Sequence, residues 1–472
     1  MAKETGISKT GLTALIVSSS IGTGIFGITS DLANAAAPGP ALLAWLFCGI
    51  GIYALVLSLN NLSKKQPELN SGIFSYAKAA FGPLGGFLSG WGYWLSAWLG
   101  NIAFATMLMS AIGYFFPVFK GGQNLPSIFV AIIFVWGLSW LVNNGVESAS
   151  FVNTIVTICK LVPLVVFMII TIVGFKAGIF TADFWGNVAN NLLHGGKVLS
   201  IFGQMKQSIM IIMWVFIGIE GASVLANRAK RRSDAQAATI MGLATLIIIY
   251  VFASILPYGV LSQAQLATIK QPAMANILKH VVGDWGASFI NVGVIISTIG
   301  SWLSWTMLPA ETTTLMVKDQ TLPSYWGKLN AKNSPTTSLI ITGVMQTLFL
   351  FTLLATDYAY NFAYTLATAA ILLSYLLVGV YQMKYSYQNG DWGQFAIGIF
   401  AAGFQLLAMI LAGWQQVLMT TLAYLPGLYF YWAASKEYKH KITKMEKVVM
   451  VIILLLALLT VTLLINGTIK IN

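Results

Sequence analysis

Long apolar stretches, separated by short polar segments, follow one another along the whole chain. Thirteen of them are close to or longer than the roughly 20 residues that a helix needs to cross a bilayer. We therefore predict an all-α integral membrane protein. The predicted spans are residues 10–35, 38–61, 84–116, 125–143, 149–174, 205–228, 237–259, 285–317, 337–356, 359–383, 394–412, 415–434 and 447–466.

Glycines interrupt two of these spans where a membrane helix should be most regular. Span 1 contains Gly22 and Gly24, and span 6 contains Gly218 followed by Glu220. Glycine destabilises a helix interior by about 1 kcal/mol relative to alanine, and backbone groups freed inside a membrane need partners in the protein or in a ligand. Paired interruptions at matching positions of two halves are typical of a transporter with a site near the bilayer midplane. The simpler interpretation is that the glycines let another helix pack closely.

Two polar side chains lie deep inside other spans. Asn101 stands at the centre of span 3, where it either makes an interhelical hydrogen bond or contacts a ligand. Lys160 lies about eleven residues into span 5, roughly 16 Å along a helix, which is near mid-bilayer. An ionisable residue at this depth is a functional candidate by default. Lys160 either titrates and couples transport to protons, or is a fixed ammonium that binds carbonyl groups of the broken span 1.

The composition agrees with a membrane protein and gives no reason to expect a nucleic-acid partner. Of 472 residues, 57% are hydrophobic and 8% are charged, whereas soluble domains carry about 25% charged residues. The net charge of +12 follows from the placement of the basic residues. With a cytoplasmic N-terminus, most Lys and Arg residues fall in inner loops, including those at 228–232 and 436–447, as the positive-inside rule requires. The C-terminus is then extracellular, and residues 71–77 predict a short amphipathic helix on the inner surface.

No metal site or cofactor is expected. The three histidines fall in predicted loops without ligand spacing, and both cysteines lie within spans: His194, His280, His440, Cys48 and Cys159. An intramembrane enzyme would need a nucleophile with a base, or metal ligands, inside the spans. A channel would need acidic rings or a carbonyl filter motif, and the sequence shows neither. These patterns favour a transporter over an enzyme or a channel, and leave open a sensor that keeps a transporter fold.

Several motifs resemble the amino acid–polyamine–organocation transporter superfamily. They are Gly22-Thr23-Gly24-Ile25-Phe26, Phe216-Ile217-Gly218-Ile219-Glu220 and the segment from Trp305 to Glu311. Within the superfamily, the chain looks like the basic amino acid/polyamine antiporters, and most like arginine/ornithine exchangers. The run from Tyr93 to Asn101 also resembles arginine/agmatine antiporters. Lys160 matches a lysine of some proton-coupled relatives and departs from the arginine/agmatine type, and a thirteenth span departs from the common twelve.

The resemblance implies a fold of two inverted five-helix repeats, in which helices 1 and 6 are discontinuous. A cytoplasmic N-terminal segment, residues 1–9, precedes the first repeat, residues 10–174 with spans 1–5. The second repeat covers residues 205–383 with spans 6–10, and spans 11–13 follow at residues 394–466. Spans 11 and 12 lack breaks and charges, so they are expected to be scaffold or the surface of a homodimer.

The resemblance also implies the residues that bind substrate. The substrate carboxylate binds backbone of span 1, and the α-amino group meets carbonyl groups of spans 1 and 6. The substrate side chain is read from span 3, and Trp305 offers its ring face to a cationic head. The substrate-binding set is Gly22, Thr23, Gly24, Ile25, Ser96, Ala97, Asn101, Trp214, Ile217, Glu220 and Trp305. Gating or coupling is expected of Trp214, Glu220 and Lys160.

The expected function is secondary active antiport across a bacterial inner membrane. A cationic amino acid is exchanged for its metabolic product, as arginine for ornithine, by alternating access around a midplane site. The alternatives are exchange of an amino acid for its decarboxylated amine, such as histidine for histamine or tyrosine for tyramine, and proton-coupled amino acid uptake. The expected partners are small amino acid and amine substrates and the lipid bilayer.

Overall fold

The computed structural model describes residues 8–69, 72–145, 150–188, 199–220, 232–355 and 359–469. Among these residues every regular element is a helix, as predicted. The chain falls into two compact units, which are described separately. The first unit is Met1–Lys65, Met107–Asn124 and Ser150–Ser301, and the second is Gln66–Thr106, Leu125–Ala149 and Trp302–Asn472.

The structure confirms the predicted spans as helices where it describes them, and residues 221–228 of predicted span 6 lie outside the described residues. In the described part of the chain, ten helices are long and apolar enough to cross a membrane. They are Pro38–Lys65, Ile73–Phe115, Leu125–Asn143, Val156–Val173, Gln236–Gly259, Asp284–Lys318, Thr336–Ala355, Ala359–Gln388, Trp392–Leu411 and Lys444–Ile465. Of the other three predicted spans, span 12 is the less apolar α18 (Trp414–Glu437). Spans 1 and 6 are interrupted where the glycines predicted it.

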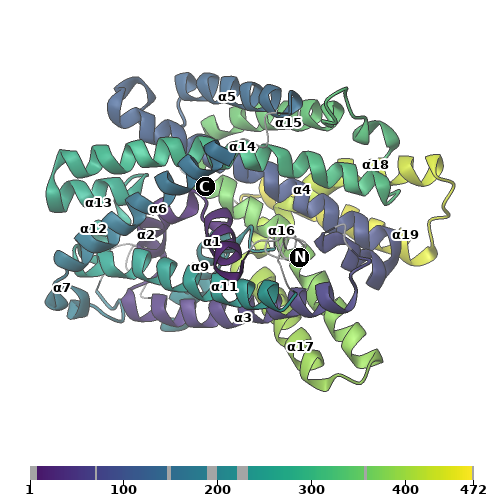
Figure 1. Cartoon of the computed structure of the whole chain (residues 1–472), viewed down its shortest axis with the longest axis horizontal. Coiled ribbons are helices and arrows are strands. Elements are labelled where there is room, and N and C mark those ends of the chain that lie inside the picture. The colour runs from purple at the N-terminus through teal and green to yellow at the C-terminus, as the bar shows by residue number, and fades with distance from the viewer. Residues whose placement is uncertain are drawn as a thin grey trace, which may run out of the picture. The chain divides into compact units, whose positions relative to one another are not determined.

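The first unit contains both halves of the broken span 1. Helix α1 (Lys9–Ser20) packs against α11 (Arg232–Ile255), beside which it lies in Figure 1, and also contacts α6 (Ser150–Val173). Helix α2 (Gly24–Ala35) packs against α9 (Ile201–Phe216). The remaining helices of this unit are α3 (Pro38–Lys65), η1 (Pro117–Phe119), α7 (Ala177–Ala182), η3 (Leu256–Gly259), α12 (Gln263–Ala267), α13 (Ala273–Val282) and the first part of α14 (Asp284–Lys318).

Two side chains from the segment that follows α11 hold the end of α2. The Tyr258 hydroxyl donates to the Ala36 carbonyl at 2.7 Å, and the Gln263 amide donates to the Ala33 carbonyl at 3.0 Å. The last carbonyl groups of a helix have no partner within that helix. These hydrogen bonds therefore satisfy buried acceptors and fix α2 against η3 and α12.

The second unit contains most of α4 (Ile73–Phe115), which is two helices joined at a break. Gly82 has φ 75° and ψ −167°, so the membrane-length part begins at Pro83. Proline suits the first position of a helix, because its missing N–H would have no helical acceptor there. The other elements are α5 (Leu125–Asn143), η4 (Ser324–Gly327), α15 (Thr336–Thr352), η5 (Leu353–Ala355), α16 (Ala359–Gln388), α17 (Trp392–Leu407), η6 (Ala408–Ala412), α18 and α19 (Lys444–Ile465). Helices α5 and α15 run side by side (Figure 1).

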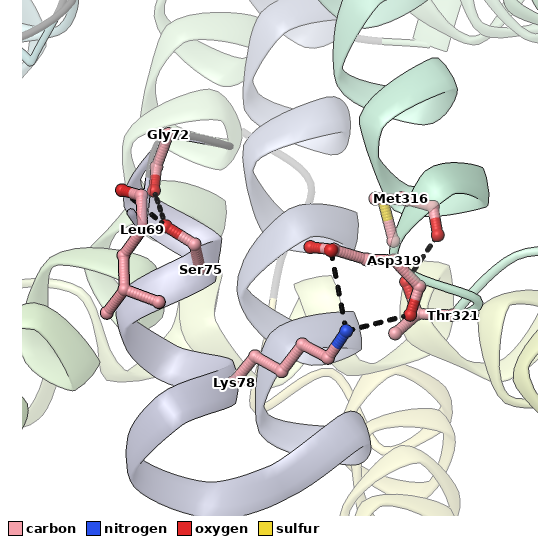
Figure 2. A network of polar contacts seen from close by, with 7 residues as sticks. All are labelled: Leu69, Gly72, Ser75, Lys78, Met316, Asp319 and Thr321. Carbon is pink, nitrogen blue, oxygen red and sulfur yellow. Dashed lines mark hydrogen bonds and ion pairs between the residues drawn. The ribbon is translucent and has the colours of Figure 1, made fainter. Parts of the chain in front are cut away.

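The short helix expected at residues 71–77 is the first part of α4, from Ile73 onward, while residue 71 lies outside the described residues. Lys78 on this helix reaches the end of α14, as Figure 2 shows. Its ammonium donates to the Asp319 carbonyl oxygen at 3.0 Å and lies 3.4 Å from the Asp319 carboxylate. Lys384 of α16 donates to the Ala80 carbonyl at 3.0 Å. The short helix is therefore tied to the ends of two long helices.

Helix α19, the thirteenth predicted span, begins with a buried carboxylate. Glu446 accepts hydrogen bonds from the Thr443 N–H at 2.7 Å and from the Tyr431 hydroxyl at 2.8 Å. It also accepts one from the N–H of Leu84, the second residue of the membrane-length part of α4. The first N–H groups of a helix lack partners within the helix. Glu446 thus caps both its own helix and, from far along the chain, α4.

Candidate functional site

Span 1 is broken at the residues that the sequence predicted. Helix α1 ends at Ser20, and α2 begins at Gly24, so that Ile21, Gly22 and Thr23 lie between them. Ile21 is extended, with φ −73° and ψ 100°, and the Thr23 hydroxyl makes no capping hydrogen bond. The first N–H groups of α2 point out of its N-terminus without helical partners, and this end carries partial positive charge. Such an end is suited to bind an anionic group.

The carbonyl end of α1 has a partner that the sequence did not reveal. The Tyr250 hydroxyl of α11 donates to the Ser20 carbonyl at 3.1 Å, and both residues are buried. The only available signal was a tyrosine inside predicted span 7, which is a common residue and not a specific one. The hydrogen bond shows that the protein itself satisfies part of the backbone freed by the break.

In predicted span 6 the helix also ends at a turn with glycine, and residues 221–228 of that span lie outside the described residues. Helix α9 ends at Phe216, Ile217 is extended with φ −61° and ψ 131°, and Gly218 has φ 104°. A positive φ of this size strains any residue except glycine, which explains Gly218. The Glu220 carboxylate accepts from the Gly218 N–H at 3.0 Å. Ile217 and Glu220 are buried, so the turn after α9 lies inside the protein.

The two breaks meet at Gly24 and Trp214. An added Cβ on Gly24 would lie 2.6 Å from Trp214 Nε1 and 3.0 Å from Val215 Cγ1. The last turn of α9 therefore lies directly on the first residue of α2. This contact brings together Gly24 and Trp214 of the predicted set, with Ile25 next to them in sequence and buried.

In the second unit, Asn101 contacts the backbone of Trp305. The Asn101 side-chain amide donates to the Trp305 carbonyl oxygen at 3.1 Å. The Trp305 ring packs edge-on against Phe104, one turn further along α4, with ring centroids 6.1 Å apart. The interhelical hydrogen bond, one of the two interpretations of Asn101, is thus present. The physical reason is Pro309 in α14, which has no N–H to donate to the Trp305 carbonyl. The sequence analysis did not use this proline, although it stands four residues after Trp305.

The remaining predicted residues are buried, except Gly22, which is partly exposed. Ser96 and Ala97 lie on α4, five and four residues before Asn101, with exposed fractions of 1% and 0%. Among the described residues, the hydroxyl groups of Ser96 and Thr23 have no hydrogen-bond partner in the protein. Lys160 lies on α6, which contacts α1, and is 6% exposed. The structure thus presents the predicted residues in two groups, one in each unit.

In the described ranges, no three His, Cys, Asp or Glu side chains gather closely enough to hold a metal ion. The described architecture is a multi-pass bundle of apolar helices, in which span 1 is broken between Ser20 and Gly24 and α9 ends at a turn that contains Gly218. Helices broken in this way bind substrates and ions in secondary transporters. The fold and site therefore define the class, which is a membrane transporter.

Comparison with known proteins gives the family. The family model described as "Amino acid permease" matches residues 7–468. The chain is 53% identical to the "Arginine/ornithine antiporter" of Latilactobacillus sakei over 100% of both chains. It is 36% identical to the "Arginine/ornithine antiporter" of Pseudomonas aeruginosa and 38% identical to the "Arginine/agmatine antiporter" of Chlamydia caviae, over 95% of each chain. The chain belongs to the amino acid permease family, and is a multi-pass transporter of the cell membrane.

Proposed function

We propose that this protein exchanges arginine for ornithine across the cell membrane by alternating access. The observation that carries the proposal is the contact between Trp214, in the last turn of α9, and Gly24, the first residue of α2. A helix N-terminus attracts a carboxylate, whereas a C-terminal end with free carbonyl groups attracts an ammonium. Both charged groups of an amino acid backbone then have a partner at one place. The names of relatives at 36–53% identity support arginine and ornithine as the pair.

The amino acid backbone binds in the first unit. Its carboxylate accepts hydrogen bonds from N–H groups of Gly22, Thr23, Gly24 and Ile25, and the Thr23 hydroxyl is a further donor. Its ammonium donates to carbonyl groups of the broken span 1 and of residues 214–217. Burial of Thr23, Gly24 and Ile25 supports the assignment, because hydrogen bonds to charged groups strengthen where water is excluded.

The cationic side chain is assigned to residues of α4 and α14, as the family resemblance implies. Asn101, Ser96 and the backbone at Ala97 accept from its N–H groups, and the Trp305 ring offers a face to its charge. A cation over an indole face gains about 0.5–2 kcal/mol, more when water is excluded. The buried Ser96 hydroxyl supports this role, because a buried polar group without a partner is costly until a ligand satisfies it.

Three buried residues of the first unit couple binding to movement. Trp214 covers the bound molecule at the first break. Glu220 links substrate occupancy to movement of the turn after α9, since its carboxylate already holds the Gly218 N–H. Lys160 presents an ammonium from α6 toward the region of α1, in the role that a coupled cation has in other transporters. Lys160 thereby stabilises one of the two access states.

We propose for the membrane the arrangement that the family resemblance and the placement of basic residues imply. Two inverted repeats, residues 10–174 and 205–383, supply the broken helices α1–α2 and α9, and residues 394–466 supply the last three spans. The N-terminus and the basic segment 436–447 face the cytoplasm, and the C-terminus faces outward. Two copies associate as a homodimer through α17 and α18.

Counterflow in proteoliposomes tests the function. Vesicles containing the purified protein are loaded with arginine, ornithine, agmatine, histidine, histamine, tyrosine, tyramine or buffer, and uptake of labelled arginine is followed. We expect rapid uptake only into vesicles loaded with arginine or ornithine. Equal uptake into empty vesicles would show net transport instead of exchange. Fastest uptake into vesicles loaded with agmatine would show that agmatine, and not ornithine, is the exchanged product.

A further inference from the structure

Pro309 removes one hydrogen bond from the backbone of α14. In an α-helix the carbonyl of each residue accepts from the N–H four residues later. For Trp305 that residue is Pro309, which has no N–H and whose ring pushes the carbonyl aside. The Trp305 carbonyl is therefore free of its helical partner, in the interior of a helix long and apolar enough to cross a membrane.

Asn101 occupies one of the two acceptor positions of the Trp305 carbonyl oxygen. Its amide nitrogen donates to the Trp305 carbonyl at 3.1 Å, and the side chain is 0% exposed. A carbonyl oxygen has two lone pairs, so a second donor can still bind there. The other amide atom of Asn101, Oδ1, is a buried acceptor without a hydrogen-bond partner among the described residues. The Trp305 carbonyl oxygen and Asn101 Oδ1 are therefore two neighbouring acceptors, and each can accept a further hydrogen bond.

We propose that the Trp305 carbonyl oxygen and Asn101 Oδ1 form an acceptor pair that binds the cationic head of the substrate, and that Pro309 is the specificity-determining residue that makes this pair available. The inference rests on the proposed exchange of cationic amino acids and deepens it. Pro309 acts through the Trp305 carbonyl, so it is a positioning residue and does not itself touch the substrate.

The chemistry of the head group fits the pair. A guanidinium carries five N–H donors and an ammonium three, and neither has an acceptor, so both can bind two adjacent oxygens. An apolar side chain would leave Asn101 Oδ1 without a hydrogen bond and the second lone pair of the Trp305 carbonyl unused. A site built for hydrogen bonds rejects a substrate that lacks the donors much more strongly than an apolar pocket rejects a misfit. The acceptor pair therefore selects cationic over apolar amino acids.

The competing explanation is purely structural. Pro309 would only bend α14, and Asn101 would only satisfy the carbonyl that the bend exposes. Both explanations expect Asn101 to stabilise the fold. They differ for Pro309, whose replacement by alanine returns an N–H to the Trp305 carbonyl. Only the acceptor-pair proposal expects this change to weaken cationic substrates.

The test compares Pro309→Ala with Pro426→Ala, which restores one N–H inside α18 of the same unit and touches neither Asn101 nor Trp305. We expect Pro309→Ala to raise the apparent KM for arginine and ornithine about tenfold, which corresponds to about 1.4 kcal/mol, without lowering the melting temperature. Pro426→Ala should leave both KM values unchanged. Unchanged KM values in Pro309→Ala would overturn the proposal.

A second comparison does not depend on transport. Asn101→Leu leaves the Trp305 carbonyl unsatisfied and should lower the melting temperature, whereas the double variant Asn101→Leu/Pro309→Ala should recover it, because the N–H at 309 replaces the lost donor. If the double variant recovers the melting temperature but the wild-type protein exchanges neither arginine nor ornithine, the proposed function is wrong. The hydrogen bonding between residue 309, Asn101 and the Trp305 carbonyl would still hold. If the wild-type protein exchanges both substrates but the double variant does not recover the melting temperature, Pro309 does not control the Trp305 carbonyl in the way proposed.

Discussion

The indole of Trp214 occupies the space beside Gly24 where any larger residue would place its Cβ. Gly24 opens α2 and Trp214 lies in the last turn of α9, so this one contact joins the two helix breaks. The glycine is explained by close approach of a side chain from another helix. A substitution at position 24 therefore changes the geometry of both breaks at once.

Gly24→Ala should abolish most exchange while the protein still folds. The new Cβ would lie 2.6 Å from Trp214 Nε1, so the indole must move, whereas alanine itself favours the helix by roughly 0.5–1 kcal/mol. Initial counterflow rates in proteoliposomes measure the loss. Gly137→Ala on α5 is the control, because a Cβ there meets nothing within 4 Å. Wild-type rates for Gly24→Ala would mean that the indole position is not important.

Tyr250→Phe should destabilise the first unit. The change removes the hydroxyl that donates to the Ser20 carbonyl, and leaving a buried acceptor unsatisfied costs about 1–3 kcal/mol. A lower thermal unfolding midpoint of the purified protein in detergent measures this cost. Tyr53→Phe on α3 provides the comparison, since Tyr53 is 43% exposed. Identical midpoints for the two variants would show that another group takes over the Ser20 carbonyl.

Lys160→Ala should reduce exchange strongly, because it removes a buried positive charge from α6. Lys160→Gln is neutral but keeps a donor, so we expect it to bind substrate and to exchange with a flatter pH dependence. The exchange rate is measured between about pH 5 and about pH 9. Lys176→Gln is the matched control at an exposed lysine after α6. A Lys160→Gln variant with the wild-type pH profile would leave Lys160 as a structural cation.

Lys78→Met should destabilise the second unit more than Asp319→Asn does. Lys78 donates to the Asp319 carbonyl, which Asp319→Asn leaves in place, so that variant loses only a partly exposed ion pair worth about 0–1 kcal/mol. Lys78→Met loses the hydrogen bond as well. Thermal unfolding at low and high salt separates the two terms, since salt screens the ion pair. Equal losses of stability in both variants would show that Lys78 stabilises the unit only through its ion pair with the Asp319 carboxylate.

Much of the fold can be predicted from the sequence because the bilayer imposes it. A helix that crosses a membrane must be long and apolar, so the spans are visible as stretches of composition. The interruptions are equally visible, because glycine is costly in such a helix. The break at Gly22 and the turn at Gly218 are confirmed where the sequence placed them. The Pro83 start of the membrane-length part of α4 also agrees with the predicted span.

The partners of the freed backbone groups cannot be predicted in this way. Tyr250 binds the Ser20 carbonyl and Asn101 binds the Trp305 carbonyl across more than 200 residues of sequence. Each pairing depends on which helices become neighbours and on how each is rotated, and a single sequence contains neither quantity. Asn101 could be recognised as important from its depth, but its acceptor could not be recognised without the position of Pro309.

The carboxylate at the start of α19 bears on how this protein can be shortened or fused. Removal of the chain from Thr443 onward would leave the Tyr431 hydroxyl and the Leu84 N–H without their acceptor. Helix α19, the thirteenth predicted span, therefore cannot be removed without loss of these hydrogen bonds, although most of its surface faces away from the protein. A reporter or affinity tag belongs after Ile465, where it leaves this anchoring intact.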